Sequence, residues 1–302
     1  MCIEAKQLVE EYIPGYLLHG FYPSGANAVE IAIKMAMNTT QRSRVISFHQ
    51  SMHGKTLFAN QLGFASHVDD NHQVIRLPFI GELDEEAVLA ACKNHMATGN
   101  VAAVIVEPIQ MSGGGHRASN KFYQQLESLA IDYDVMQIYD EILTGFYRAG
   151  VPFLCHRMGI KPDIVLAGKA MGSGHPVAAI LHKQTFQLSQ SLRAGGTYFN
   201  HPMACASVIA TLNAYQQLHI EAQIDKIEQC IRTQLPGECL SGSGALWNID
   251  LGTKENADKT VEQLFAHKII VSFYQHYIRF LPSFQVDLNQ LIEACRIVRK
   301  RL

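Results

Sequence analysis

The chain has 302 residues, of which 48% are hydrophobic and 17% are charged, and its formal net charge is −2 at pH 7. These values are typical of a globular protein with one large and one smaller domain, and they give no electrostatic reason to expect binding to nucleic acid or to an anionic membrane. No apolar run is long enough to span a bilayer, and the seven scattered cysteines contain no C-x-x-C pair, so we expect a cytoplasmic protein with reduced thiols and without a metal site.

The first predicted elements are a helix from Cys2 to Tyr12, ended by Pro14-Gly15, and a turn at Ser24-Gly25-Ala26 that opens a second helix. Backbone N–H groups at a turn of small residues before a helix can bind an anion such as a phosphate. A plain N-cap by Ser24 explains the same residues equally well.

Apolar runs of strand length then alternate with helical stretches. We expect strands at Arg44–Phe48, Val101–Pro108, Val135–Glu141, Ile164–Ala167 and Val177–Leu181, and helices at Glu82–Met96 and Lys121–Asp132. The alternation predicts an α/β protein with a mostly parallel sheet and helices on both faces.

A long helical stretch from Met203 to Leu235 leads to the last part of the chain, which is predicted to be a small α+β unit. Its expected elements are strands at Ala245–Leu251, Ile269–Phe273 and Tyr277–Leu281 and a final helix at Leu288–Leu302. We therefore divide the chain into a large domain, residues 1–235, and a small C-terminal domain, residues 236–302.

Asp140 lies at the carboxyl end of one predicted buried strand, and Lys169 follows the next. Because the carboxyl ends of parallel strands meet at one edge of a sheet, these two residues and the turn at Gly25-Ala26 could share a crevice. Taken alone, Asp140 could be an ordinary salt-bridge acid and Lys169 a surface lysine. Together they match the three groups that hold pyridoxal phosphate: an anion site for its phosphate, an acid for its ring nitrogen, and a lysine for a Schiff base.

Short motifs along most of the chain extend this pattern. They are Ser24–Ala28, His53–Thr56, Val106–Gln110, Asp140–Phe146, Lys161–Ile164, Gly168–Ala170, Gly196–Ala206 and Ile278–Pro282. In this order they resemble the class III aminotransferases, the ornithine, acetylornithine and omega-amino-acid type, which have the pyridoxal-phosphate-dependent transferase fold of type I. The resemblance implies a pyridoxal-phosphate-dependent transaminase that moves an amino group from an amino donor to a carbonyl acceptor, and a homodimer with shared active sites.

The resemblance also implies roles for the matching residues. Lys169 would form the Schiff base and shuttle a proton, and Asp140 would keep the ring nitrogen protonated. Arg279 would bind a substrate carboxylate, and Thr197 would reach the phosphate held by the partner subunit. The other residues expected at the cofactor are Ser24, Gly25, Ala26, Met52, His53, Glu107, Gln110 and Ile142.

The chain departs from the family pattern at several positions. Met52 stands where an aromatic residue usually stacks on the cofactor ring, and Ser112 replaces the acid that pairs with the arginine in ornithine-type members. The stretch before the turn at Ser24 is also shorter than in the family. Two alternatives therefore remain open: a pyridoxal-phosphate-dependent aminomutase or epimerase, and an inactive truncated homologue that acts as a structural partner.

Overall fold

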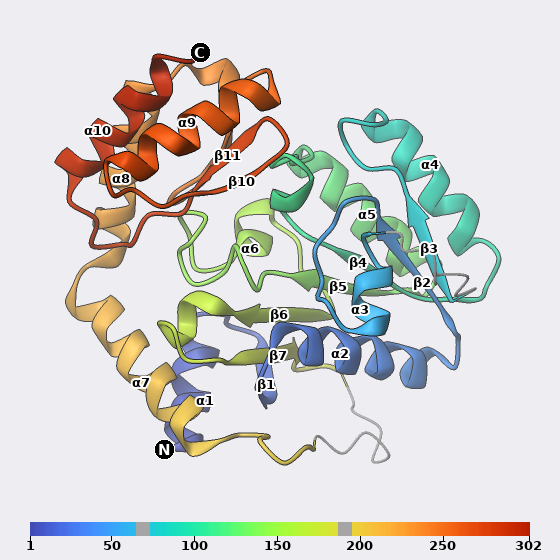
Figure 1. Ribbon diagram of the computed structural model, residues 1–302. Coiled ribbons are helices and arrows are strands. Elements are labelled where there is room, and N and C mark those ends of the chain that lie inside the picture. The colour runs from blue at the N-terminus through green and yellow to red at the C-terminus, as the bar shows by residue number, and fades with distance from the viewer. Residues whose placement is uncertain (65–72, 187–194) are drawn as a thin grey trace.

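A seven-stranded sheet forms the centre of the computed structural model, which describes residues 1–64, 73–186 and 195–302 (Figure 1). Its strands, in chain order, are β1 (Tyr16–Tyr22), β2 (Arg44–Phe48), β3 (Val74–Leu77), β4 (Val101–Val106), β5 (Met136–Asp140), β6 (Ile164–Gly168) and β7 (Ala178–Lys183). They lie in the order β1-β7-β6-β5-β4-β2-β3. Strands β2 to β6 run parallel, whereas β7 is antiparallel to both of its neighbours, β6 and β1. The predicted α/β fold with a mostly parallel sheet is confirmed.

Each face of this sheet carries its own apolar core, because alternate strand residues point to opposite sides. On one face α2 (Gly25–Thr40) packs Ala32 and Ile33 into a cluster with Ile138 and Leu166. On the other face Tyr139 and Val165 belong to a core that several helices cover. These helices are α1 (Cys2–Glu11), α4 (Glu85–Met96), α5 (Asn120–Asp132), α6 (Leu154–Met158) and α7 (Pro202–Gln217).

The C-terminal unit has a separate antiparallel sheet in the order β10-β11-β9-β8. Its core packs Trp247 and Ile278 of the sheet against Ile224 of a helix. The strands are β8 (Leu240–Ser243), β9 (Leu246–Asp250), β10 (Ser272–Tyr274) and β11 (Tyr277–Phe280), and the helices are α8 (Ile220–Gln234), α9 (Lys254–Ala266) and α10 (Leu288–Arg299). Figure 1 shows this unit, in orange and red, beside one end of the large sheet.

The helical stretch predicted from Met203 to Leu235 is interrupted. His219 has φ 48°, a left-handed conformation that breaks the helical hydrogen-bond ladder between α7 and α8. Since α7 packs on α1 and α8 shares the core of the C-terminal sheet, we propose to divide the domains at 218–219 rather than after residue 235.

Six helices and strands were not predicted: the strands β1, β3 and β8, the helix α9, and the short helices α3 (Leu57–Gln61) and α6. Within the described ranges, no helix combines the length and the apolar composition needed to cross a membrane.

Candidate active site

A cavity of about 440 Å³ lies at the carboxyl edge of the parallel strands. Eight of the residues expected at the cofactor line it, and they come from four places: the N-terminus of α2, the loop after β2, the end of β5 and the end of β6. These residues are Ser24, Gly25, Ala26, Met52, His53, Asp140, Ile142 and Lys169. The structure thus brings Ser24 together with Lys169, which lies 145 positions later in the sequence.

The N-terminus of α2 forms one wall. Ser24 is its N-cap, and the Ser24 hydroxyl accepts a hydrogen bond from the backbone N–H of Asn27 at 3.3 Å. The N–H groups of Gly25 and Ala26 belong to the first turn, where a helix offers no acceptor of its own. The N-cap interpretation is therefore confirmed, and it leaves donors and the positive end of the helix dipole available for an anion.

Close backbone approaches shape this wall into a cradle. Gly54 has φ +150°, and a Cβ added there would lie 2.7 Å from the Cβ of Ala26 and 2.8 Å from that of Ala59. A Cβ on Gly25 would meet Cδ1 of Ile142 at 2.9 Å. Glycine at both positions therefore allows the loop after β2 and Ile142 to pack closely on the first turn of α2, and the donor groups of that turn fit the phosphate of the cofactor expected from the sequence.

Asp140 and His53 form a buried pair in the floor of the cavity. Oδ2 of Asp140 lies 2.7 Å from Nδ1 of His53, and Oδ1 accepts a hydrogen bond from the backbone N–H of Ile142 at 3.1 Å. Burial alone would lower the pKa of His53, but the hydrogen bond and the negative charge of Asp140 outweigh it, so the pKa is raised. Among the described residues, Nε2 of His53 has no hydrogen-bond partner.

A second buried acid, Glu107, stands behind this pair. Its carboxylate accepts a hydrogen bond from the backbone N–H of Met52 at 2.8 Å and so holds the loop after β2. Burial raises the pKa of Glu107 to about 7, although the charge of His53 opposes the rise. Gln110 does not line the cavity, and its Nε2 donates a hydrogen bond to the backbone carbonyl of His49 at 2.8 Å.

Lys169 starts a short 3-10 helix, Lys169–Gly172, directly after β6. Its φ of 40° is unusual for a residue other than glycine, and such conformations are found more often at functional sites. Six residues that were not expected at the cofactor line the same cavity, four of them in one run after Lys169: Pro23, Gly54, Gly174, His175, Pro176 and Val177. The short interval between Lys169 and the next apolar run could have indicated the four that follow Lys169.

Four predicted residues do not line this cavity: Glu107 and Gln110, described above, and Thr197 and Arg279. Thr197 is exposed, and its expected contact with a partner subunit stays a prediction. Arg279 lines a different cavity, of about 540 Å³, on the C-terminal unit. Burial lowers the pKa of Arg279 overall, although the nearby charge of Glu107 acts in the opposite direction. In the described part of the chain, Nε of Arg279 has no hydrogen-bond partner.

Comparison with known proteins finds aminotransferases that match nearly the whole chain. The chain is 28% identical to the succinylornithine transaminase of Photorhabdus laumondii over 96% of this chain and 75% of that relative. It is 30% identical to the acetylornithine aminotransferase of Bacillus subtilis over 96% of this chain and 77% of that relative. The chain thus spans about three quarters of the length of these two proteins.

The fold of the chain is also similar to the folds of solved structures. An S-selective transaminase from Bacillus megaterium superposes with a TM-score of 0.85 at 19% identity, over 98% of this chain and 79% of that one. The family model described as aminotransferase class-III matches residues 3–302. Because that match extends over nearly the whole chain, the protein belongs to the class-III aminotransferases and is a pyridoxal-phosphate-dependent transaminase.

Proposed function

We propose that Lys169 and Asp140 are the catalytic residues of this transaminase and that the 440 Å³ cavity binds its pyridoxal phosphate. When bound, the cofactor supplies a ring that draws electrons from the substrate carbon as the amino group is transferred. The observation that carries the proposal is the presence of the Lys169 side chain, the buried Asp140–His53 pair and the α2 N-terminus in the wall of one cavity.

Each side of the cavity would bind a different part of the cofactor. The first-turn N–H groups of Gly25 and Ala26 would donate hydrogen bonds to the phosphate. Asp140 would hold a proton at the ring nitrogen, and His53, with its raised pKa, would keep that carboxylate oriented and charged. Met52 would pack its polarizable sulfur on the ring, in the place of an aromatic residue.

Lys169 would bond the cofactor aldehyde in the resting enzyme and then carry a proton at Nζ from and to the substrate carbon. Arg279 would bind a substrate carboxylate, a task that suits a planar guanidinium. The absence of an ion-pair partner for Arg279 among the described residues supports this role.

The first test locates the cofactor bond. Purified protein is mixed with pyridoxal phosphate and reduced with borohydride, and the modified peptide is identified by mass spectrometry. We expect a pyridoxyl group on Lys169, and none in the Lys169→Arg variant. Lys183→Arg is the matched control, because it keeps the charge that pairs with Asp163 at 3.1 Å, away from the cavity. A folded protein without an adduct at Lys169 would instead support the inactive homologue.

The amino donor is then sought with acetylornithine and succinylornithine, the compounds in the relatives' names, by following the cofactor's absorbance. Transfer of the amino group to an added carbonyl compound is the outcome expected of a transaminase. Return of a rearranged or epimerised donor, with the amino group retained, would support the alternative reaction.

We also propose that the protein is a homodimer in the cytoplasm and that Thr197 completes the partner's phosphate site. All seven cysteines are free, as expected in a reducing compartment.

Mixed subunits test the dimer. In a hybrid of Lys169→Ala and Thr197→Ala chains, one site regains both residues only if Thr197 acts across the interface. Recovery of tight cofactor binding in the hybrid, measured by absorbance, is expected, and no recovery would place Thr197 in its own subunit's site.

A further inference from the structure

Another cavity, of about 380 Å³, lies at the junction of α7 and α8. Its walls come from the end of α1, the loop between β5 and α6, the last turn of α7 and the first turn of α8, and it shares no lining residue with the 440 Å³ cavity. Three aromatic rings and one carboxylate stand out in its lining, those of Tyr12, Tyr147, Tyr215 and Glu221.

The three tyrosine rings form a row along this cavity. The ring centres of Tyr12 and Tyr147 are 5.9 Å apart, with an angle of 88° between the rings, and those of Tyr147 and Tyr215 are 6.4 Å apart at 79°. Because neighbouring rings are nearly perpendicular, successive walls of the cavity face different directions, and a compact group between them could contact more than one ring. The negative faces of such rings attract a cation.

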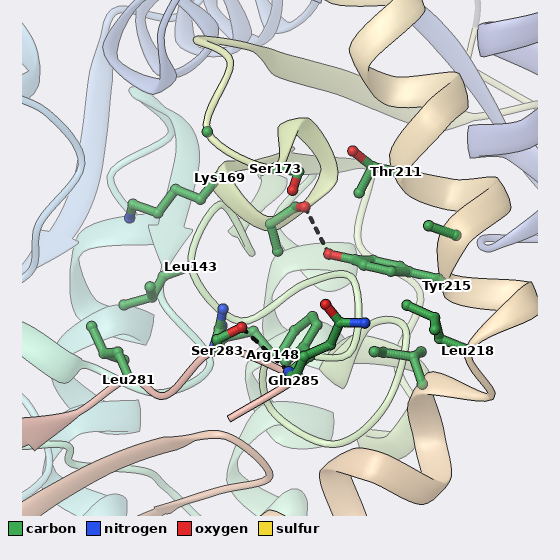
Figure 2. A pocket seen from close by; sticks show the side chains of 15 residues that line it. Leu143, Arg148, Lys169, Ser173, Thr211, Tyr215, Leu218, Leu281, Ser283 and Gln285 are labelled. Carbon is green, nitrogen blue, oxygen red and sulfur yellow. Dashed lines mark hydrogen bonds between the residues drawn. The ribbon is translucent and has the colours of Figure 1, made fainter. Parts of the chain in front are cut away.

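The rings at both ends of the row are anchored through their hydroxyl groups. The Tyr12 hydroxyl donates to the carbonyl of Leu212 at 3.4 Å. Figure 2 shows Tyr215 projecting from α7 toward the 3-10 helix that begins at Lys169, where the Tyr215 hydroxyl donates to the carbonyl of Ala170 at 2.7 Å. Rings that are already fixed lose little freedom when a ligand binds, which favours binding.

The fixed charge beside the rings is negative. Glu221 is the one carboxylate of the lining, and none of the lining residues is a lysine or an arginine. Burial is the main cause of the raised pKa of both Tyr12 and Tyr147, and Glu221 raises each pKa further, so its carboxylate lies near both hydroxyls. Glu221 forms no ion pair with any described residue. Its charge is therefore available to a ligand.

The chain supplies no cation of its own to these rings. Within the described part of the chain, guanidinium groups lie over two aromatic rings: Arg148 is 4.2 Å from the ring centre of Phe284, and Arg232 is 4.6 Å from that of Trp247. Neither ring lines this cavity. Arg148 lines the neighbouring cavity of about 550 Å³, which also has Tyr215 in its wall, and does not line this one.

We propose that this cavity is a binding site for a small organic cation, a ligand with a quaternary ammonium group, and that the three tyrosine rings contact its methyl groups while Glu221 balances its charge. A primary ammonium has three N–H donors to satisfy, and the cavity offers one carboxylate; a quaternary group has none to satisfy. The ligand would contact residues on both sides of the break at His219 and so link α1 and α7 to the C-terminal unit.

A quaternary nitrogen cannot form a Schiff base, so the proposed ligand is not a substrate of the amino transfer. The inference therefore goes beyond the proposed function and does not depend on it. An acid in the first turn of a helix is favourable without any ligand, so Glu221 alone would indicate nothing. The rings beside it carry the inference.

The test compares a cation with a neutral molecule of the same shape. Choline and 3,3-dimethylbutanol differ in a nitrogen that replaces a carbon, and each is titrated into the holoenzyme by ligand-observed NMR at pH 8, where an ordinary histidine is neutral. Glu221→Gln removes the charge and is isosteric, and Tyr12→Leu keeps an apolar side chain but removes a ring. The matched controls are Glu262→Gln on α9 and Tyr274→Leu on β10, both at exposed positions.

We expect choline to bind about tenfold more tightly than the neutral alcohol. Glu221→Gln and Tyr12→Leu should each reduce that preference by about fivefold, and the two controls should keep it. Equal binding of the two probes, a preference that survives in either variant, or an equal loss in a control overturns the inference. Should Tyr12→Leu fail to fold, Glu221→Gln decides, because that side chain is exposed and the change is isosteric.

A further titration separates this cavity from the cofactor site. Choline should bind equally well to the protein with and without pyridoxal phosphate, because the two cavities share no lining residue. Loss of choline binding when the cofactor is added would place choline in the 440 Å³ cavity and overturn the inference. A pyridoxyl group on Lys169 together with equal binding of choline and the alcohol would leave the proposed function intact.

Discussion

The free energy of unfolding of the Glu107→Gln variant, relative to that of wild type, should increase as pH rises from mildly acidic to alkaline. The carboxyl of Glu107 is buried, and its pKa is raised from an ordinary 4.5 to about 7. A raised pKa means that the folded state holds the proton more tightly than the unfolded chain. Glu107 therefore favours folding fully below pH 4.5, and this contribution is lost as pH rises through about 7.

The magnitude follows from that interval. At about 1.4 kcal/mol for each pH unit, the difference between 4.5 and about 7 corresponds to about 3.5 kcal/mol, of which about 2.5 kcal/mol falls between pH 5 and pH 8. Glutamine is nearly isosteric, and its Oε1 can still accept the hydrogen bond from Met52, so the variant lacks the titration but keeps the contact.

Urea unfolding of both proteins without cofactor, at pH 5 and pH 8, measures the effect. The free energy of unfolding of the variant minus that of wild type should rise by about 2.5 kcal/mol from the lower to the higher pH. All other titrating groups are shared by the two proteins and largely cancel. An unchanged difference would show that Glu107 is ionised at pH 5 in the folded protein, and the reasoning from burial would be refuted.

Three further substitutions probe the site and its supports. Ser24→Ala should cost about 1 kcal/mol, seen as a lower thermal midpoint, because α2 loses its N-cap; a midpoint equal to that of wild type would show that the cap adds nothing. Gly242→Ala should destabilise the C-terminal unit severely, since its Cβ would lie 2.0 Å from the carbonyl oxygen of Leu246 at φ +142°; a normally folded variant in far-ultraviolet circular dichroism would contradict this close approach. His53→Asn should weaken pyridoxal phosphate binding by about tenfold in an absorbance titration, because Asp140 loses its buried partner; unchanged affinity would make that pair merely structural.

The parts of the fold that were predicted correctly are those with local patterns. The strand at Ile164–Gly168 is continuous and apolar because it is buried on both faces, and the helix at Gly25–Thr40 has a capping serine and a periodic apolar face. By contrast, β1 contains His19 and Gly20 in its middle, and it is a strand because it pairs with β7, more than 150 positions later in the chain. The break at His219 has no glycine or proline beside it to indicate it.

The same distinction applies to the site. The residues of the 440 Å³ cavity follow one another in a recognisable order along the chain, mostly at strand ends, so their meeting could be predicted. A second cavity is lined by Arg148, by Tyr215 of α7 and by Gln285, which lies in the loop before α10. Each of these segments looks unremarkable alone, and their meeting depends on how the C-terminal unit packs beside the sheet, which no local pattern encodes.

The reversed direction of β7 has a consequence for chain entropy. Because β7 runs antiparallel to β6, the segment 169–177 leaves and rejoins the sheet at the same edge, and its ends are fixed by the paired residues Gly168 and Ala178. The loop that carries Lys169 is therefore already closed when the domain has folded. Little backbone freedom of this loop remains to be lost when the lysine engages a ligand, so the entropy cost of binding comes mainly from ordering the lysine side chain.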